Sequence, residues 1–230
     1  MGRFYPTRSF LNTDLKRLWR TSLAGLKTNL LPGLVLWSVS LVVVVAYYFW
    51  APAAAWLGVV AEMKVRYGYW YSAVATAVAG GLVPVLVLIL MGKIREGAVV
   101  GQVVFYVVFW AWRGVEVDAI YRLQSWVFGD SAEVGTIVSK VLVDQFVYCP
   151  LWAAPVTAVF YLWKDSGFVW RGLGKRFYVE RVAPVLLSTW LVWIPAVSLI
   201  YALPLALQVP LFNLVLCFFV LLVAALGDGD

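Results

Sequence analysis

The chain has 230 residues, of which 63% are hydrophobic and 13% are charged. A soluble domain carries about twice that share of charge, so an ordinary soluble protein is excluded. We therefore expect an all-α integral membrane protein, a bundle of about six transmembrane helices with interfacial amphipathic helices.

The N-terminal region, residues 1–32, is predicted to be a cytoplasmic amphipathic segment. Leucines recur at helical spacing between residues 11 and 30, and Asn12 or Thr13 is a candidate N-cap. Basic residues lie among them, so the helix is expected to bind the lipid bilayer through anionic headgroups. An organellar transit peptide is the alternative.

Several apolar runs are long enough, or nearly so, to cross a hydrocarbon core about 30 Å thick. These expected spans are residues 33–50, 70–91, 97–112, 141–163, 182–203 and 209–226. The third run is short, and we expect Arg113 at its end to snorkel toward the membrane surface. We expect Trp110 in the same run to face lipid.

Charge predicts the orientation. With residues 1–32 inside, the expected spans place 13 of the 18 basic residues on one side of the membrane. The positive-inside rule then puts both termini in the cytoplasm of a bacterial inner membrane, with a mitochondrial inner membrane as the alternative. Because the net charge of +6 is spread over three flanking segments, it indicates lipid headgroups and no nucleic-acid partner.

Two connecting segments are also expected to be amphipathic. Residues 115–126 carry an apolar stripe, and Asp118 and Arg122 stand four apart in the order that favours a helical ion pair. Asp130 is a candidate N-cap of the following helix. Residues 170–181 combine an apolar edge with basic residues, which favours a helix on anionic headgroups over a phosphate site.

A charged cluster leads into the fourth expected span. Lys140 and Asp144 are one helical turn apart and Gln145 follows, so we expect Lys140 and Asp144 to pair on one face. An ionisable residue in a membrane is costly unless it is paired or hydrated, which makes this cluster the candidate site. It is either a polar clamp to neighbouring helices or the polar lining of a solute pathway.

Prolines within the expected spans form a second group of candidate residues, and we expect helix kinks at Pro150, Pro155 and Pro195. Each proline removes a helical hydrogen bond and leaves a carbonyl free to meet water or a neighbouring hydroxyl group. Such kinks either open a cavity or only shape the packing.

An enzyme is not expected. The chain has no histidine, so it lacks a Ser-His dyad, an imidazole ligand for haem and an HExxH zinc site. Asp144 is the only acid within the expected spans, so a pair of aspartates for an intramembrane protease is missing. We expect neither a metal nor a cofactor.

The chain resembles the family of Mpv-seventeen and the twenty-two-kilodalton peroxisomal membrane protein. The resemblance rests on Lys140-x3-Asp144-Gln145-x4-Pro150, then an apolar span, a basic loop, and Trp193, Pro195 and Tyr201. The segment from Gly114 to Tyr121 is similar to the family's glycine-rich segment. One departure is Ile194, which is inserted between Trp193 and Pro195.

The resemblance divides the chain and implies a function. Residues 97–226 would form the family's four-helix membrane core, residues 33–96 an N-terminal extension with two transmembrane helices, and residues 227–230 an acidic tail. Family members are described as weakly selective channels for small solutes. We therefore expect a channel or pore-type transporter, with Lys140, Asp144 and Gln145 lining its outer entrance. The alternative is a structural or assembly subunit of an inner-membrane complex, and both leave room for a homo-oligomer.

Overall fold

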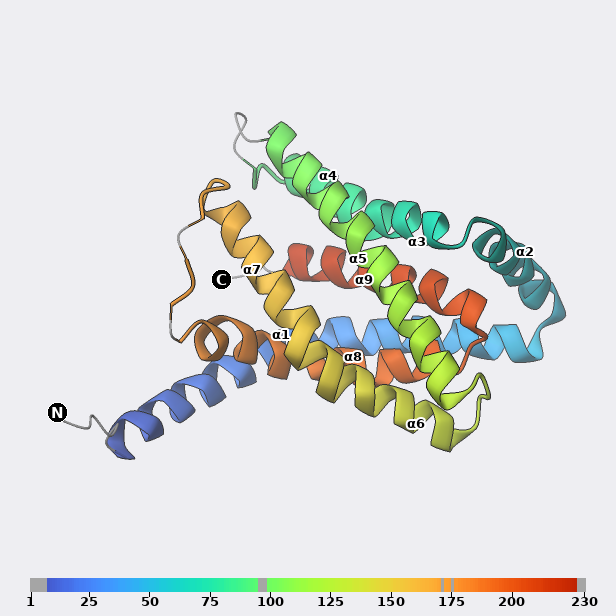
Figure 1. The fold of residues 1–230 in the computed structure, drawn as a ribbon, viewed down its shortest axis with the longest axis horizontal. Coiled ribbons are helices and arrows are strands. Elements are labelled where there is room, and N and C mark those ends of the chain that lie inside the picture. The colour runs from blue at the N-terminus through green and yellow to red at the C-terminus, as the bar shows by residue number, and fades with distance from the viewer. Residues whose placement is uncertain (1–7, 95–98, 171, 175, 227–230) are drawn as a thin grey trace.

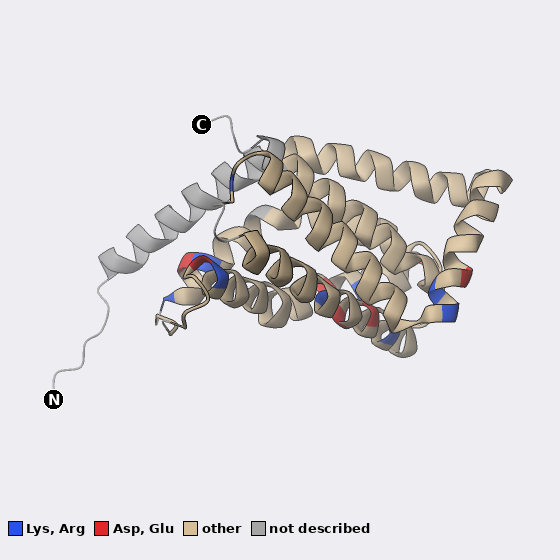
Figure 2. Cartoon of the chain, turned by 90° about the horizontal axis from the view of Figure 1, so that it is seen from above, with Lys and Arg blue, Asp and Glu red and all other residues tan. Residues whose placement is uncertain are grey.

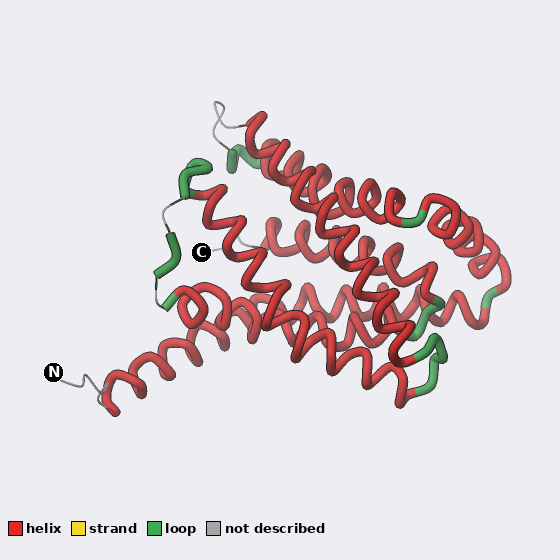
Figure 3. Tube along the Cα trace, viewed as in Figure 1, coloured by secondary structure: helices red, strands yellow, loops and turns green. Residues whose placement is uncertain are grey.

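The computed structural model describes residues 8–94, 99–170, 172–174 and 176–226, with side chains from residue 29 to residue 222 except in those gaps and at residue 188. Most of the described residues are helical and none of them lies in a strand (Figure 3). The α-helices are α1 (Arg8–Phe49), α2 (Ala51–Tyr67), α3 (Tyr69–Thr76), α4 (Val83–Leu90), α5 (Val99–Phe128), α6 (Val134–Val143), α7 (Ala154–Asp165), α8 (Ala183–Tyr201) and α9 (Leu205–Leu226). Three π-helical segments continue or join them: η1 (Ala77–Leu82), η3 (Asp144–Ala153) and η4 (Tyr178–Val182).

Among the described residues, 4 helical stretches are long and apolar enough to cross a membrane: Asn29–Phe49, Tyr69–Leu90, Val134–Asp165 and Leu205–Leu222. A fifth is added if Tyr178–Leu187 and Thr189–Tyr201, which meet at 51°, form one span. The described part of the expected run 97–112, residues 99–112, is the first half of α5, which is not among these stretches. Several membrane-compatible helices are therefore present, whereas the sixth span stays a prediction.

Helix α1 differs from the expected division into a surface helix and a span. It is one helix of 42 residues, with Pro32 inside it. It begins at Arg8, so the predicted N-cap at Asn12 or Thr13 is wrong. The apolar face was predicted for residues 12–30, and nearly all of these side chains lie outside the described residues.

The segment between the first two expected spans forms a helix, α2, that the sequence did not predict. Pro52 lies in its first turn, where a missing backbone N–H costs nothing because no helical partner exists there. Gly68 ends the helix with a φ of 53°, a left-handed value that glycine adopts readily. This turn starts α3, which continues through η1 into α4.

Helix α5 merges two elements that the sequence separated. It has 30 residues and contains both the described part of the expected third span, residues 99–112, and the predicted amphipathic segment 115–126. The stripe expected there partly faces outward, since Leu123 and Trp126 are exposed. The inward face carries Val117, Tyr121 and Gln124, all buried.

The main core forms where α1, α8 and α9 meet (Figure 1). Val192, Ala196 and Ile200 recur every four residues on α8, and none of them is exposed. Trp37 Nε1 of α1 donates to Val192 O at 2.9 Å, and Tyr48 Oη donates to Ala202 O, just past the end of α8, at 2.6 Å. These bonds fix the register of α1 against α8.

Small residues allow α3 and η1 to approach α5 closely. A Cβ added at Gly114 would lie 2.2 Å from Ser72 O, and one added at Gly81 would lie 2.7 Å from Tyr106 O. Close backbone approach at small residues is a common way to pack helices in membranes. Figure 2 shows that the charged residues gather in a few groups, while long helical stretches carry none.

Candidate functional site

A cavity of about 660 Å³ lies between α5, η3, α7, η4, α8 and α9. Some of its lining residues are buried, among them Tyr121, Asp144 and Gln145. Others are exposed, among them Asp165 and Arg181. Its volume is in the range of small-molecule sites. The candidate residues Asp144 and Gln145 therefore lie in the wall of a cavity that has both buried and exposed lining.

Asp144 is the centre of a buried hydrogen-bond network. Tyr201 Oη donates to Asp144 Oδ2 at 2.6 Å, and Gln145 Nε2 donates to Oδ1 at 2.9 Å. Cys149 Sγ contacts the same Oδ1 at 3.8 Å. Gln124 Nε2 of α5 donates to the Tyr201 hydroxyl group at 2.8 Å. The network thus joins α5, η3 and α8, as the clamp interpretation predicts.

The expected ion pair between Lys140 and Asp144 does not form. Lys140 is 1% exposed, and its Nζ lies 3.7 Å from Asp130 Oδ1 and 5.7 Å from the centre of the Tyr201 ring. Helical side chains lean toward the N-terminus, which carries the lysine toward Asp130. Tyr201 contacts both residues of the expected pair, Lys140 with its ring and Asp144 with its hydroxyl group. Asp130 is therefore a partner of Lys140, and the N-cap position of α6 is Glu133.

Two of the prolines free backbone carbonyls that neighbouring side chains then bind. In the π-helix η3 each N–H bonds the carbonyl five residues earlier, so Pro150 leaves Gln145 O without a partner. Pro155 lies in the first turn of α7, directly after Ala154, whose N–H still bonds Cys149 O five residues earlier, so in the same register it leaves Pro150 O without a partner. Trp190 Nε1 of α8 donates to Gln145 O at 3.1 Å, and Tyr178 Oη of η4 donates to Pro150 O at 3.0 Å. The expectation that freed carbonyls meet neighbouring groups is confirmed here.

Pro195 and the family-motif aromatics lie on α8. The 51° bend falls between Leu187 and Thr189, well before Pro195, so a kink at Pro195 itself stays a prediction. Trp193 lines the cavity and packs against Phe212 and Phe219, with both ring centroids at 5.8 Å. Trp110, expected to face lipid, lines the cavity as well.

Arg113 does not snorkel as expected. Only 9% of its side chain is exposed, and its Nη1 lies 2.6 Å from Glu116 Oε1. Tyr148 of η3 also donates to Glu116 Oε1. Arg113 lines the cavity, and Glu116 neutralises it from the same helix. The pair of Arg113 and Glu116 was not predicted, because Arg113 was expected to lie at the end of a span.

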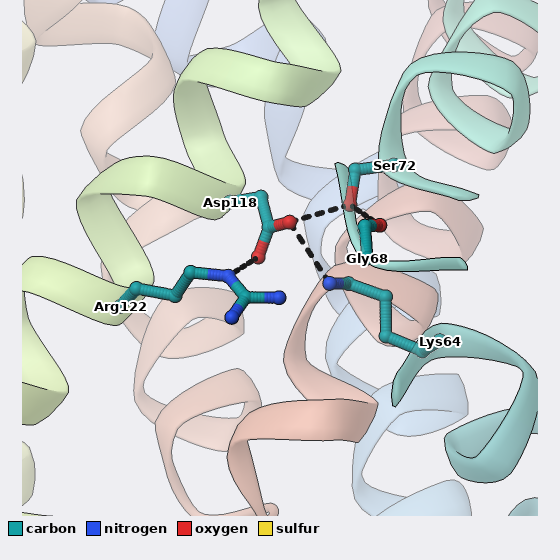
Figure 4. Close-up of polar contacts among 5 residues, drawn as sticks. All are labelled: Lys64, Gly68, Ser72, Asp118 and Arg122. Carbon is teal, nitrogen blue, oxygen red and sulfur yellow. Dashed lines mark hydrogen bonds and ion pairs between the residues drawn. The ribbon is translucent and has the colours of Figure 1, made fainter. Parts of the chain in front are cut away.

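A second network surrounds the buried Asp118 (Figure 4), and none of its residues lines the cavity. Asp118 Oδ2 accepts hydrogen bonds from Lys64 Nζ at 2.8 Å and Ser72 Oγ at 2.9 Å, and Asp118 Oδ1 accepts one from Arg122 Nε at 3.0 Å. The predicted pair of Asp118 and Arg122 is confirmed. The contact of Lys64 with Asp118 was not predicted from the sequence. A signal was present: the residues three and four positions from Lys64 are uncharged, so its ionic partner had to come from another part of the chain.

The described residues contain no group of three or more His, Cys, Asp or Glu residues that could hold a metal ion. Fold and site together define a helical protein with several membrane-compatible helices and a cavity between them. Comparisons with protein-family models, curated proteins and solved structures found no match. The resemblance to the Mpv-seventeen family accordingly stays a prediction.

Proposed function

We propose that the protein is a channel or pore-type transporter for small solutes and that the cavity is part of the solute path. The observation that carries this proposal is the position of Asp144 and Gln145 in the wall of the 660 Å³ cavity. Asp144 lies in Val134–Asp165, one of the membrane-compatible stretches, and α9 supplies another wall. A cavity between such helices would place its polar residues within the membrane, where such residues mark solute pathways.

The exposed part of the lining supports an entrance to this path. Asp165 and Arg181 line the cavity, are exposed, and stand in the sequence beside the basic segment that the positive-inside rule assigns to the cytoplasm. Lys140 does not line the cavity. In this proposal it only contacts the Tyr201 ring and Asp130 at the edge of the network.

Flux through liposomes containing purified protein tests the proposal. Ala158 of α7 lines the cavity, and Ala158→Trp would fill part of it. Ala55 is exposed on α2 and does not line the cavity, so Ala55→Trp is a matched control. We expect the protein to release small tracers, Ala158→Trp to slow the release, and Ala55→Trp to leave it unchanged. Release no faster than from empty liposomes would contradict the proposal.

One observation favours the second candidate, a structural or assembly subunit. Both Asp144 oxygens are bound by donors from the protein itself, and the bonds join three helical elements. A clamp needs no solute. A protein that forms a folded bundle and shows no flux would favour this candidate.

We propose a bacterial inner membrane with both termini in the cytoplasm, and a mitochondrial inner membrane as the alternative. A cysteine at position 170 should then react only from the cytoplasmic side, and one at position 62 only from the opposite side. Labelling of position 170 from outside would contradict this orientation. Anionic lipids and a second copy of the chain are the partners that we propose to look for first.

A further inference from the structure

The charged groups in the buried part of the wall already have partners within the protein. Asp144 accepts hydrogen bonds from Tyr201 and Gln145, and Arg113 pairs with Glu116. The remaining charged lining residues, Asp165 and Arg181, are exposed. The buried wall therefore has few free charged ligands with which to replace the hydration shell of an ion.

Most of the remaining buried wall is apolar. Val117, Leu186, Val197 and Leu216 line it and are each at most 7% exposed. An ion that enters such a space loses its hydration shell and gains no ring of carbonyl or carboxylate ligands in return. A neutral molecule loses much less, because its carbon atoms fit the apolar wall and only its polar groups need partners.

One acceptor in the wall lacks a partner. Gln145 lines the cavity and is 2% exposed; its Nε2 donates to Asp144, and its Oε1 has no hydrogen-bond partner. A buried acceptor without a donor is unfavourable, so a solute that brings a hydroxyl group would gain from reaching it.

We propose that the cavity takes small neutral molecules that carry hydroxyl groups and discriminates against inorganic ions. This inference rests on the proposed function, because it names the solute class of the same path. The hydroxyl group of the solute donates to Gln145 Oε1, while its carbon atoms contact the apolar wall.

Glycerol is the probe for the test, and potassium is the reference ion. Liposomes containing the full chain are exposed to a glycerol gradient, and swelling is followed by light scattering. Potassium release is followed in the same preparation. We expect glycerol to enter faster than into empty liposomes and potassium release to match that of empty liposomes.

Two buried glutamines supply matched variants. Gln208 of α9 resembles Gln145 in that it is 2% exposed, its Nε2 is bonded within the protein, to Leu203 O, and its Oε1 is unpaired, but it does not line the cavity or join the Asp144 network. We expect Gln145→Leu to slow glycerol entry about three- to tenfold, the effect of one lost hydrogen bond, and Gln208→Leu to leave it unchanged. Gln145→Met serves as a second variant if Gln145→Leu does not fold, as judged by size-exclusion profile and thermal unfolding.

The outcomes separate this inference from the transport proposal. Potassium flux without glycerol flux, or equal glycerol entry in the Gln145 and Gln208 variants, would overturn the inference and leave transport standing. No flux of any solute through the folded protein would overturn both.

Discussion

The hydroxyl group of Tyr201 donates a hydrogen bond of 2.6 Å to the buried carboxylate of Asp144 and thereby joins α8 to η3. Gln124 of α5 donates to the same hydroxyl group, so three elements meet at one phenol oxygen. In a buried environment each of these bonds is stronger than in water, and the loss of one leaves its partner without compensation.

Tyr201→Phe removes the donor and keeps the ring. We expect a loss of about 1.5–3 kcal/mol in the free energy of unfolding, because a hydrogen bond to a charged group is lost and Asp144 stays buried. Tyr178→Phe is the control, since Tyr178 is exposed and donates to a backbone carbonyl. Thermal unfolding in detergent measures both, and equal losses would contradict the account.

Lys64 and Asp118 should behave as a coupled pair. Their side chains are 3% and 2% exposed, and Nζ lies 2.8 Å from Oδ2. We expect Lys64→Met or Asp118→Asn alone to cost about 3–5 kcal/mol, because each leaves a buried group without its partner. The double variant should lose less than the sum of the two single losses. Additive losses would mean that the two residues do not stabilise each other.

Arg122 binds the same carboxylate from the surface. Its side chain is 42% exposed, so Arg122→Met should cost at most about 1 kcal/mol. It therefore serves as the control for the buried pair.

Pro150 leaves the carbonyl of Gln145 without a helical donor, so the contribution of the Trp190 hydrogen bond to stability should depend on the residue at position 150. Trp190→Phe removes the indole donor and should cost about 1 kcal/mol. In a Pro150→Ala background the alanine supplies a backbone N–H five residues after Gln145, so the same Trp190→Phe change should cost less. Thermal unfolding of the four proteins gives the coupling. An identical cost in both backgrounds would show that Pro150 is not what frees this carbonyl.

Sequence patterns were informative where the interaction is local. The pair of Asp118 and Arg122 followed from four-residue spacing on one helix, and the effect of Pro150 on a carbonyl followed from the missing N–H. The apolar runs likewise predicted several helices able to cross a membrane. These features depend only on backbone geometry and nearby residues.

The hydrogen-bond and ion-pair partners that side chains find on other helices could not be predicted in this way. Lys140 and Asp144 have suitable spacing, yet Tyr201 of α8 binds Asp144 and contacts Lys140, and the lysine extends to Asp130. The contact of Lys64 with Asp118 joins residues 54 positions apart. The unbroken α5 shows the same limit, because Arg113 and Asp118 are buried with partners inside the bundle and the helix continues past Arg113.

Gly114 tests the close packing of α3 against α5. A methyl group there would lie 2.2 Å from Ser72 O and 2.6 Å from the Thr76 side chain, so the helices would have to separate. We expect Gly114→Ala to destabilise the protein by about 1–3 kcal/mol. Gly135 of α6 has no neighbour within 4 Å of an added methyl group, so Gly135→Ala should be neutral or slightly stabilising. Thermal unfolding compares the two.

The most direct test of the central claim is chemical block of the cavity during transport. Cys149 and Cys217 are replaced by alanine, and Ala158→Cys places one thiol in the cavity lining, with Ala55→Cys as the exposed control. A water-soluble thiol reagent should stop solute flux through liposomes that contain the Ala158→Cys protein, and a reducing agent should restore it. The Ala55→Cys protein should react without any change in flux. Complete modification of the cysteine at position 158 with flux unchanged would show that the solute does not pass through this cavity.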